Sequence, residues 1–382
     1  MEVRATFHTI PPSQPTNMSG SGHQLENSGQ QFLDPSDNLT QLVIAKFRST
    51  LFLHTDPATI VLISLYLPIF LVAFLGNLLV LVVILPNRHM RSITNCFIVN
   101  LAIADLLVTV VCVPMAIGQS VYRPWIYGQF MCKITGYMQG VSVAASVFTI
   151  MMLSVDRYLA IRHPMTFRTY SNGRHALRLV VGVWLLSFAI MLPLIVVLRV
   201  DTIALPGADP LHFCKEAWRT PLSRQLYDSF LFIFMFIMPG CFVTISYSRL
   251  GCQLWSVSQQ AQLYNRDTKV GKQQANHIMA SRRQVARMLV FIAALFAICW
   301  MPYHILSLYL DFVELGPNTD LMAVKVLPFT IWLGHSNSAL NPILYCFMNN
   351  SFRRYTTRML HCHRRKRRKP PDSPTWSCAT PR

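Results

Sequence analysis

The chain has 382 residues, of which 52% are hydrophobic and 13% charged, and it carries a formal net charge of +18. Its apolar residues fall in long blocks rather than stripes, which excludes an ordinary soluble protein and indicates an integral membrane protein. In a membrane protein, this excess of Lys and Arg favours attraction to anionic lipid head groups over nucleic-acid binding.

Residues 1–56 precede the first apolar block and are expected to form a disordered extracellular tail. They are rich in Ser, Gln, Asn and Pro, and such a composition disfavours a packed core. The tail lacks the compact apolar stretch of a cleavable signal peptide, so the first membrane segment is expected to direct insertion. Asn17 and Asn38 lie in N-x-Ser/Thr triplets and are predicted glycosylation acceptors.

Seven apolar segments follow, and each approaches or exceeds the roughly 20 residues that a helix needs to cross a bilayer. Several contain proline, which membrane helices tolerate when neighbouring helices pack around them. The fold class expected for residues 57–350 is therefore an all-α membrane protein, a seven-transmembrane helix bundle. The segments run Ile60–Leu85, Phe97–Val121, Ile134–Ile161, Leu177–Leu198, Phe230–Tyr247, Met288–Leu310 and Val324–Phe347, with the fifth starting near Leu222.

The distribution of basic residues sets the expected orientation, because Lys and Arg accumulate on the cytoplasmic side of membrane proteins. The protein is expected in the plasma membrane, with its N-terminus extracellular and its C-terminus cytoplasmic. Polar residues fill Gly251–Ala280, which is expected as a flexible third cytoplasmic loop. Residues 351–382 are expected to form a short amphipathic eighth helix, over Ser351–Leu360, and a basic tail. Cys362 in that tail is a predicted palmitoylation site, with a plain free thiol as the alternative.

Two of the ten cysteines differ from the rest, most of which lie inside apolar segments. Cys132 lies at the outer start of the third segment, and Cys214 lies in the long stretch between the fourth and fifth. Both are expected in an oxidising compartment, so a disulfide between them is predicted. It would hold the loop against the top of the third helix; two unrelated thiols are the alternative.

Short motifs occur in order along the seven segments. They are Gly76-Asn77, Leu101-Ala102-Ile103-Ala104-Asp105, Cys132 with Asp156-Arg157-Tyr158, Trp184, Pro239 with Tyr247, Cys299-Trp300-Met301-Pro302, and Asn341-Pro342-Ile343-Leu344-Tyr345. With these motifs, residues 57 to about 360 resemble the rhodopsin-like (class A) family of G-protein-coupled receptors. Each motif alone is weak, but seven in register make chance a negligible explanation.

Three further runs narrow the resemblance to a cluster of neuropeptide receptors. The runs Asn87–Asn100, Gln139–Phe148 and Cys214–Trp218 look like those of orexin, neuropeptide FF and SIFamide receptors, with an allatotropin-like or trissin-like receptor as another subgroup. The resemblance implies an extracellular neuropeptide ligand and a heterotrimeric G protein, linked by movement of the sixth helix. A lipid or other small-molecule ligand is the alternative.

The outer halves of the segments favour a peptide over other ligand classes. Gln139 stands where amine receptors carry an aspartate, and no lysine falls in Ile331–His335, where opsins hold retinal. Acidic residues on the outer surface would attract a cationic peptide, and polar donors among apolar walls suit an amidated peptide end. The predicted ligand contacts are Met115, Gln119, Gln139, Val143, Glu216, Asp228, Leu231, Tyr303, His304, Ser307, Leu327, Ile331 and His335, above Trp300.

Asp105 is the only carboxylate deep in a segment, where a lone charge needs a cation, polar partners or a proton. The resemblance implies an allosteric sodium ion held by Asp105, Ser146, Asn337 and Ser338 in the inactive state. A polar cluster without an ion is the alternative. No other metal and no cofactor is expected.

Asp156 and Arg157 can form a charge-assisted pair at the inner end of the third segment. The resemblance implies that Arg157 swings out toward the G protein while Tyr247 and Tyr345 move in beneath it. Many relatives place an acid at the inner end of the sixth helix, where this chain has Ser281-Arg282-Arg283, so basal activity could be raised. The predicted switch residues are Asp156, Arg157, Tyr158, Tyr247, Phe296, Trp300, Pro302, Asn341, Pro342 and Tyr345.

Two other classes of membrane protein are disfavoured. The sequence shows neither the spacing of a metal-dependent or nucleophilic enzyme nor the inverted repeats and multiple mid-membrane charges of a transporter. Ser373, Thr375, Ser377 and Thr380 are candidate sites for receptor kinases, and arrestin is an expected partner of this short tail. The basic run Arg364–Lys369 is expected to contact membrane lipids.

Overall fold

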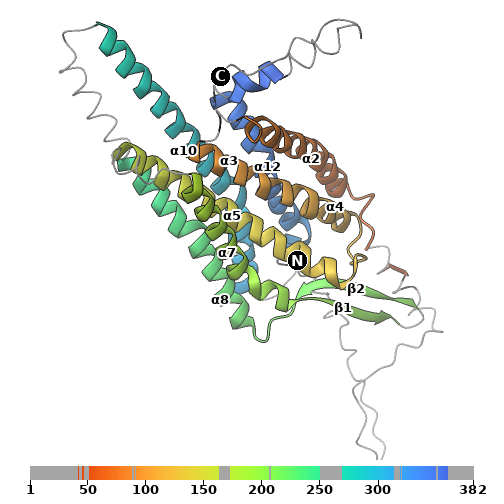
Figure 1. The fold of residues 1–382 in the computed structure, drawn as a ribbon. Coiled ribbons are helices and arrows are strands. Elements are labelled where there is room, and N and C mark those ends of the chain that lie inside the picture. The colour runs from red at the N-terminus through yellow and green to blue at the C-terminus, as the bar shows by residue number, and fades with distance from the viewer. Residues whose placement is uncertain are drawn as a thin grey trace, which may run out of the picture.

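All seven apolar segments are helical in the computed structural model, and the helices lie together in one bundle (Figure 1). The first four crossings are α2 (Pro57–Ile84), then α3 (Ile93–Leu107), η2 (Val108–Cys112) and α4 (Val113–Val121) in succession, then α5 (Gly128–Arg162) and α7 (Gly173–Val197). The last three are α8 (Pro221–Phe232) with η3 (Ile233–Ile237) and a continuation to 249, α10 (Lys269–Phe312), and η4 (Met322–Val326) with α12 (Leu327–Met348). The structure describes residues 42, 45–46, 51–87, 90, 92–162, 173–205, 208–249, 269–313, 319, 321–349 and 352–359.

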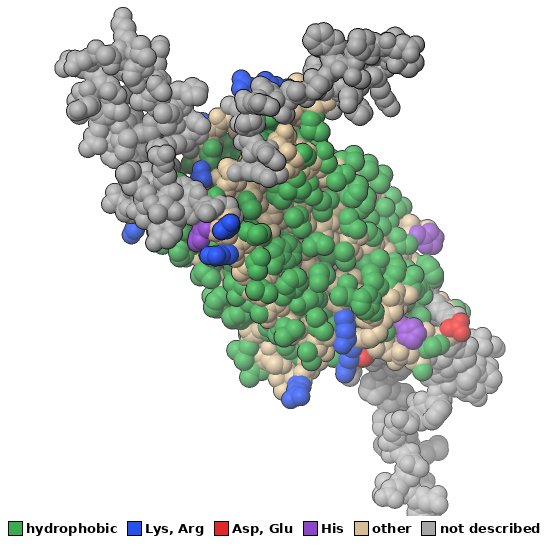
Figure 2. Space-filling model, in the orientation of Figure 1, with side chains coloured by type: hydrophobic (Ala, Val, Ile, Leu, Met, Phe, Trp, Pro, Cys, Tyr) green, Lys and Arg blue, Asp and Glu red, His purple; other side chains and the backbone are tan. Residues whose placement is uncertain are grey.

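The seventh crossing differs from the others in polarity. Within the described residues, six helices are long and apolar enough to span a membrane on length and composition alone. The seventh carries His335, Ser336, Asn337, Ser338 and Asn341, all of which are buried inside the bundle. Its polar groups therefore face neighbouring helices, not lipid. Figure 2 shows hydrophobic side chains over the middle of the molecule, with Lys and Arg mainly toward its two ends.

Side-chain caps begin three of the crossing helices. The Asp56 carboxylate at the start of α2 and the Ser92 hydroxyl at the start of α3 each accept a hydrogen bond from a backbone N–H three residues on. Thr220 begins α8 in the same way. These bonds satisfy N–H groups that lack a partner within the helix. Pro57 and Pro221 occupy the first helical positions, where no N–H is needed.

Three π-helical turns in the described residues, η2, η3 and η4, interrupt the second, fifth and seventh crossings. Each ends two residues before a proline: Pro114, Pro239 and Pro328. Proline lacks an N–H and clashes with the carbonyl four residues back, and a wider turn accommodates both defects. A π turn contains one extra residue, which rotates the following side chains by about 100° relative to an uninterrupted α-helix.

Two close contacts between helices explain motif residues near the middle of the bundle. Trp184 donates its indole N–H to the Asn100 amide oxygen at 2.7 Å, and the Asn100 amide nitrogen donates to the Thr149 hydroxyl at 2.7 Å. This chain of bonds joins the second, third and fourth crossings. A Cβ on Gly76 would lie 2.7 Å from a ring carbon of Pro342, so glycine lets α2 approach α12 at this point.

A β-hairpin covers one end of the bundle, which we call the hairpin end (Figure 1). Strands β1 (Leu198–Leu205) and β2 (Ala208–Glu216) are antiparallel, with Val200 opposite Cys214. The confirmed all-α membrane bundle thus carries one β element that the sequence analysis missed. The alternation of apolar and polar residues in Leu198–Asp201 was the available signal.

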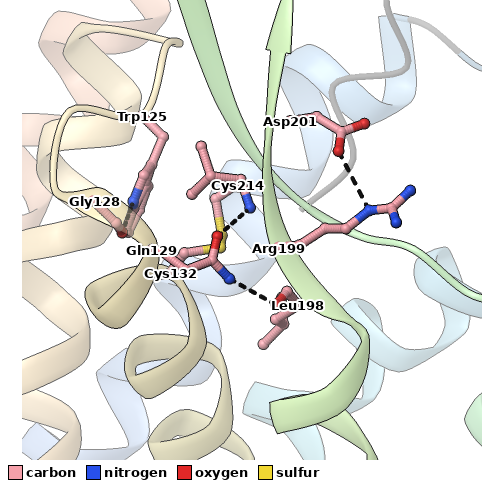
Figure 3. Close-up of a disulfide and its surroundings, with 9 residues drawn as sticks. Trp125, Gly128, Gln129, Cys132, Leu198, Arg199, Asp201 and Cys214 are labelled. Atoms are coloured by element: carbon pink, nitrogen blue, oxygen red, sulfur yellow. Dashed lines mark hydrogen bonds and ion pairs between the residues drawn. A yellow bond between two sulfur atoms is a disulfide. The ribbon is translucent and has the colours of Figure 1, made fainter.

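The predicted disulfide between Cys132 and Cys214 is present, and it fixes the hairpin to the start of α5 (Figure 3). Next to it, the Gln129 side chain accepts a hydrogen bond from Val200 N–H at 2.8 Å and donates to the Leu198 carbonyl at 3.4 Å. The N–H of Trp125 donates to the His212 carbonyl on the other strand. The hairpin is therefore held along both of its strands.

At the opposite end, which we call the far end, α10 begins at Lys269 and projects beyond the bundle (Figure 1). The expectation of a flexible loop as far as Ala280 was therefore wrong for residues 269–280. Their Lys, Gln, Ala and Met residues are polar or small but favour helix strongly, and no proline precedes Pro302 in this helix. Residues 250–268 lie outside the part of the chain that the structure describes.

The short helix predicted after the seventh crossing is present at 352–359. Asn349 caps it by accepting a hydrogen bond from Phe352 N–H at 3.0 Å. Phe352 is buried while Arg353 and Arg354 are exposed, so the helix is amphipathic as expected. The predictions for Asn17, Asn38, Cys362, the basic run Arg364–Lys369 and the four tail Ser and Thr residues fall outside the described residues, as does most of 1–56.

Candidate functional site

A cavity of about 160 Å³, which we call cavity one, lies beneath the hairpin and is lined by residues from the second to the seventh crossing. The disulfide forms part of its wall, with Trp125 and Leu198 beside it. The predicted ligand contacts that line cavity one are Gln119, Gln139, Val143, Glu216, Asp228, Leu231, Tyr303, His304, Ser307 and Ile331, together with Trp300. Ten of the residues selected from sequence are thus brought together in one cavity.

Three predicted ligand contacts lie elsewhere. Met115 packs against the cluster formed by Trp125 and Cys132. Leu327 lines a separate cavity between the first, second and seventh crossings. His335 is 1% exposed, and its Nδ1 lies 3.2 Å from the hydroxyl of Tyr66 on α2. These three side chains are therefore not part of the lining of cavity one.

Carboxylates gather at the rim of cavity one. Glu216 ends β2 and accepts a hydrogen bond from the Trp218 indole at 2.8 Å. Asp228 on α8 lies beside both Glu216 and Asp311, the latter near the end of α10. The Asp311 side chain is only 2% exposed. Asp311 was not among the predicted ligand contacts, although its position in the last turn of the sixth crossing was visible in the sequence.

One guanidinium partly compensates these charges. Arg224 Nε lies 2.8 Å from Asp311 Oδ1 and 4.0 Å from Asp228 Oδ2. Asp228 and Asp311 thus share a single arginine, and Glu216 lies beside Asp228, so carboxyl groups outnumber the guanidinium at the rim. Such an arrangement attracts a further cationic group.

Two amide side chains also line this cavity. Gln139 on α5 and Gln119 on α4 both line cavity one. In the part of the chain that the structure describes, neither side chain forms a direct hydrogen bond, so both amides can donate to and accept from a bound molecule. Apolar neighbours such as Val143 and Leu231 supply the remaining walls.

The indole of Trp300 connects cavity one to the core. It is 3% exposed and meets the His335 ring edge to face, with ring centroids 6.2 Å apart. A Cβ on Gly334 would lie 2.7 Å from the Trp300 ring, so a glycine at this position lets the indole lie against α12. Gly334 was missed because a glycine inside an apolar helix gives no indication of what it contacts.

The predicted switch pair lies at the far end of α5. Arg157 Nε donates to Asp156 Oδ2 at 3.0 Å, and the pair is mostly shielded from solvent. Tyr247 lies close by, with its hydroxyl 3.4 Å from that of Ser154. Among the other predicted switch residues, Phe296, Asn341, Pro342 and Tyr345 are buried, Tyr158 is half-buried and Pro302 lies inside α10.

A polar cluster surrounds Asp105 midway along the bundle. Its Oδ2 accepts a hydrogen bond from the Asn341 amide at 2.8 Å, and Ser338 also bonds to the carboxylate. Ser146 and Asn337, the other two residues of the predicted ion site, are buried as well. The Asn337 amide oxygen has no hydrogen-bond partner within the described residues. A buried carboxylate and a buried, unsatisfied amide oxygen are both donors of the kind that a hard cation prefers.

A hydrogen bond joins the sixth and seventh crossings at the far end. Gln284 donates its amide N–H to the carbonyl oxygen of Met348, the last residue of α12, at 2.7 Å. A carbonyl at a helix C-terminus has no partner within its own helix, so the side chain satisfies it. The contact joins the inner end of α10 to α12.

The bundle, the disulfide and the ordered motifs together are those of a seven-helix membrane receptor. Residues 76–345 match the family model described as 7 transmembrane receptor (rhodopsin family), and the chain belongs to this family. It is 34% identical over 313 residues to neuropeptide FF receptor 2 of Mus musculus, covering 79% of this chain and 73% of that protein. It is 35% identical over 353 residues to neuropeptide FF receptor 1 of Homo sapiens, covering 90% and 78% respectively.

Proposed function

We propose that this receptor is activated by a cationic extracellular neuropeptide and passes the signal to a heterotrimeric G protein by movement of α10. The observation that carries this proposal is the group of carboxyl groups at the rim of cavity one, where Asp228 and Asp311 share Arg224 and Glu216 lies beside Asp228. The names of its relatives, which are receptors for neuropeptide FF, support the same ligand class. Its role is signalling, not catalysis.

The two amide side chains of cavity one suit an amidated C-terminus. A terminal carboxamide carries no charge and offers both a donor and an acceptor, as Gln139 and Gln119 do. A peptide whose cationic side chain reaches Asp228 would place its terminal amide near Gln139. A free carboxylate at the same point would find no cation among the predicted contacts that line the cavity, provided that His304 is neutral.

A ligand screen tests the proposal. Cells that express the receptor with calcium and cyclic-AMP reporters are exposed to a library of amidated peptides with matched free-acid forms. Activation by amidated cationic peptides, and weaker activation by their free acids, is expected. Trypsin-treated tissue extract that still activates the receptor would contradict a peptide ligand and favour a lipid or small molecule.

We further propose the orientation and the remaining partners from charge and position. The hairpin end faces the extracellular space, and the far end with Arg157 contacts the G protein. Exposed Arg353 and Arg354 on the short helix lie where they can contact anionic lipid head groups. Receptor kinases and arrestin would act on the tail beyond 359, and a palmitoyl chain on Cys362 would anchor it.

A sodium ion at Asp105 is proposed for the resting state. The residues fit such an ion because Asn337 has an unsatisfied buried oxygen, and no described residue forms an ion pair with Asp105. Asp105, Ser146, Asn337 and Ser338 would hold it. The ion would supply positive charge that stabilises the resting arrangement of these buried oxygens.

Replacing Asp105 with asparagine should abolish the dependence of agonist affinity on sodium, because the substitution removes the charge that holds the ion. Allosteric coupling of this kind typically changes affinity by about 5- to 150-fold. Agonist binding is measured in sodium chloride and in N-methyl-D-glucamine chloride at equal ionic strength. A sodium effect of the same size in Asp105→Asn and in the wild type would show that the ion acts elsewhere.

Replacing Gln284 with alanine should raise basal activity. The substitution removes the bond to the Met348 carbonyl, and a neutral hydrogen bond contributes about 0.5–1.5 kcal/mol, or about two- to twelvefold in population. Basal nucleotide exchange is measured at matched surface expression, with Arg287→Ala on the exposed face of the same helix as the control. If Gln284→Ala leaves basal exchange at the wild-type level, this contact does not restrain α10.

A further inference from the structure

A second cavity, which we call cavity two, lies beside cavity one at the hairpin end. It encloses about 140 Å³ between α2, α4 and the start of the seventh crossing. Thr59, Leu62, Leu327 and Phe329 belong to its helical walls, and Phe213 of β2 also lines it. Cavity two shares Ala116, Gln119 and Cys214 with cavity one, so the two hollows adjoin across a common wall.

The volume of cavity two limits what it can hold. A dry protein cavity of about 150 Å³ accommodates a single benzene molecule. Cavity two is of similar size, so it can take one ring-sized apolar group. Its largely apolar walls favour such a group over a cluster of water molecules.

Charge at the edge of cavity two selects the polar part of the occupant. Arg123, Lys325 and Asp56 all line it. Asp56 already accepts hydrogen bonds from the backbone N–H of Thr59 at 3.3 Å and from the Thr59 hydroxyl at 3.5 Å, as the cap of α2. Neither Arg123 nor Lys325 forms an ion pair with any described residue. The cavity therefore presents two cations against one partly engaged anion.

Arg123 is the cation of cavity two that would gain most from binding a carboxylate. Its side chain is half-buried, and burial lowers the pKa of its guanidinium, while the nearby Asp56 opposes that shift. A cation that has lost part of its hydration gains more from a directly bound carboxylate than an exposed one does. The backbone N–H of Arg123 is held by the Leu51 carbonyl at 3.1 Å, which fixes this position in the loop.

We propose that cavity two binds a small carboxylate with an apolar body the size of one aromatic ring, with the carboxylate at Arg123 and the ring among Leu62, Leu327 and Phe329. The occupant is a free small molecule, distinct from the peptide at cavity one. Because Gln119 and Cys214 belong to both walls, its binding would be coupled to the affinity of the peptide site.

Protection of an introduced thiol tests this site without any peptide or G protein. Ser120 lines cavity two only, and Ser120→Cys is labelled with the neutral reagent methyl methanethiosulfonate in membranes from expressing cells. The wild type measures the background from native cysteines. The probe is 3-phenylpropanoate, and 3-phenylpropanol is its uncharged match. For so small a ligand we expect a dissociation constant of about 1 mM, so about 10 mM probe should slow labelling about tenfold.

The charge is tested with matched arginine variants on the Ser120→Cys background. Arg123→Gln should remove the protection by 3-phenylpropanoate, whereas Arg219→Gln, which removes the same charge from an exposed arginine outside the cavity lining, should retain it. Ala323→Cys provides a second labelling position in the same lining if Ser120→Cys does not reach the surface. Any of three results would overturn the proposal. The alcohol protects as well as the carboxylate, the protection survives Arg123→Gln, or neither probe slows labelling of the introduced thiols. Failure of these tests would leave the peptide assignment at cavity one untouched.

Discussion

Replacing Asp228 with asparagine should lower the potency of the activating peptide by about 30-fold or more. Removing one partner of a desolvated, hydrogen-bonded charge pair costs about 2 to 5 kcal/mol, and about 1.4 kcal/mol corresponds to a tenfold change in affinity. Asp228 lies between Glu216 and Asp311 at the rim of cavity one. Arg224 keeps Asp311 as its partner in this variant, so the effect reports on the ligand and not on an orphaned arginine.

Asp201→Asn is the matched control for this experiment. Asp201 is also an acid at the hairpin end, but it pairs with Arg199 and Lys215 on the strands (Figure 3 shows the pair with Arg199). Removing its charge should slow association at most, in a manner that salt suppresses. Dose-response curves at matched surface expression compare Asp228→Asn with Glu216→Gln and Gln139→Ala. Wild-type potency in all three would show that the peptide does not use cavity one in this way.

Breaking the disulfide with Cys214→Ser should abolish high-affinity ligand binding and reduce surface expression. The bond holds β2, with Glu216 two residues beyond Cys214, against the start of α5. Removal of a native disulfide typically costs about 2 to 5 kcal/mol of stability. Radioligand binding and cell-surface labelling measure the two effects, and mass spectrometry of non-reduced digests identifies the linked peptides.

The Cys132→Ser, Cys214→Ser double variant should be no worse than either single variant, because both lose the same bond. Cys241→Ser, which changes an exposed free cysteine on the fifth crossing, should bind normally. Full ligand binding by Cys214→Ser would mean that the hydrogen bonds of Gln129 and Trp125 suffice to hold the hairpin in place.

Hydrophobic blocks and motif spacing predicted the seven helices, the eighth helix and the disulfide, because burial in a membrane imposes a strong compositional signal. The start of α10 at Lys269 was missed for a related reason. In residues 269–280, polar composition was taken as evidence of a loop, although the same residues have high helix propensity. Polarity indicates contact with water and does not by itself indicate a loss of helix.

Two of the three predicted ligand contacts outside cavity one follow directly on π turns. Met115 comes three residues after η2, and Leu327 comes immediately after η4. The extra residue of a π turn rotates the side chains that follow it by about 100°. Gln119 and Ile331 follow the same two turns and line cavity one as predicted, so the turns alone do not explain these two misses. The prolines at 114 and 328 signalled a distortion, but sequence alone does not say whether a proline is met by a π turn or by a kink.

Other site residues depend on contacts that only the fold creates. Asp311 and Arg224 meet across the fifth and sixth crossings at 2.8 Å, and Gln284 reaches the end of α12. These pairs are distant in sequence, and their residue types also occur on ordinary solvated surfaces. Their roles become visible only when the burial of each side chain and the position of its partner are known.

The π turns also determine where helix segments can be joined in chimeras between two receptors. In the second and fifth crossings, each π turn separates the half that lines the cavities from the half that carries an inner motif residue, Asp105 in the second and Tyr247 in the fifth. If a chimera is joined on either side of a π turn and the donor helix lacks that π turn, every grafted side chain is rotated by about 100°. Grafts that include the whole turn and its proline preserve the facing of both halves, so in these two crossings the unit of exchange is the outer half-helix together with η2 or η3.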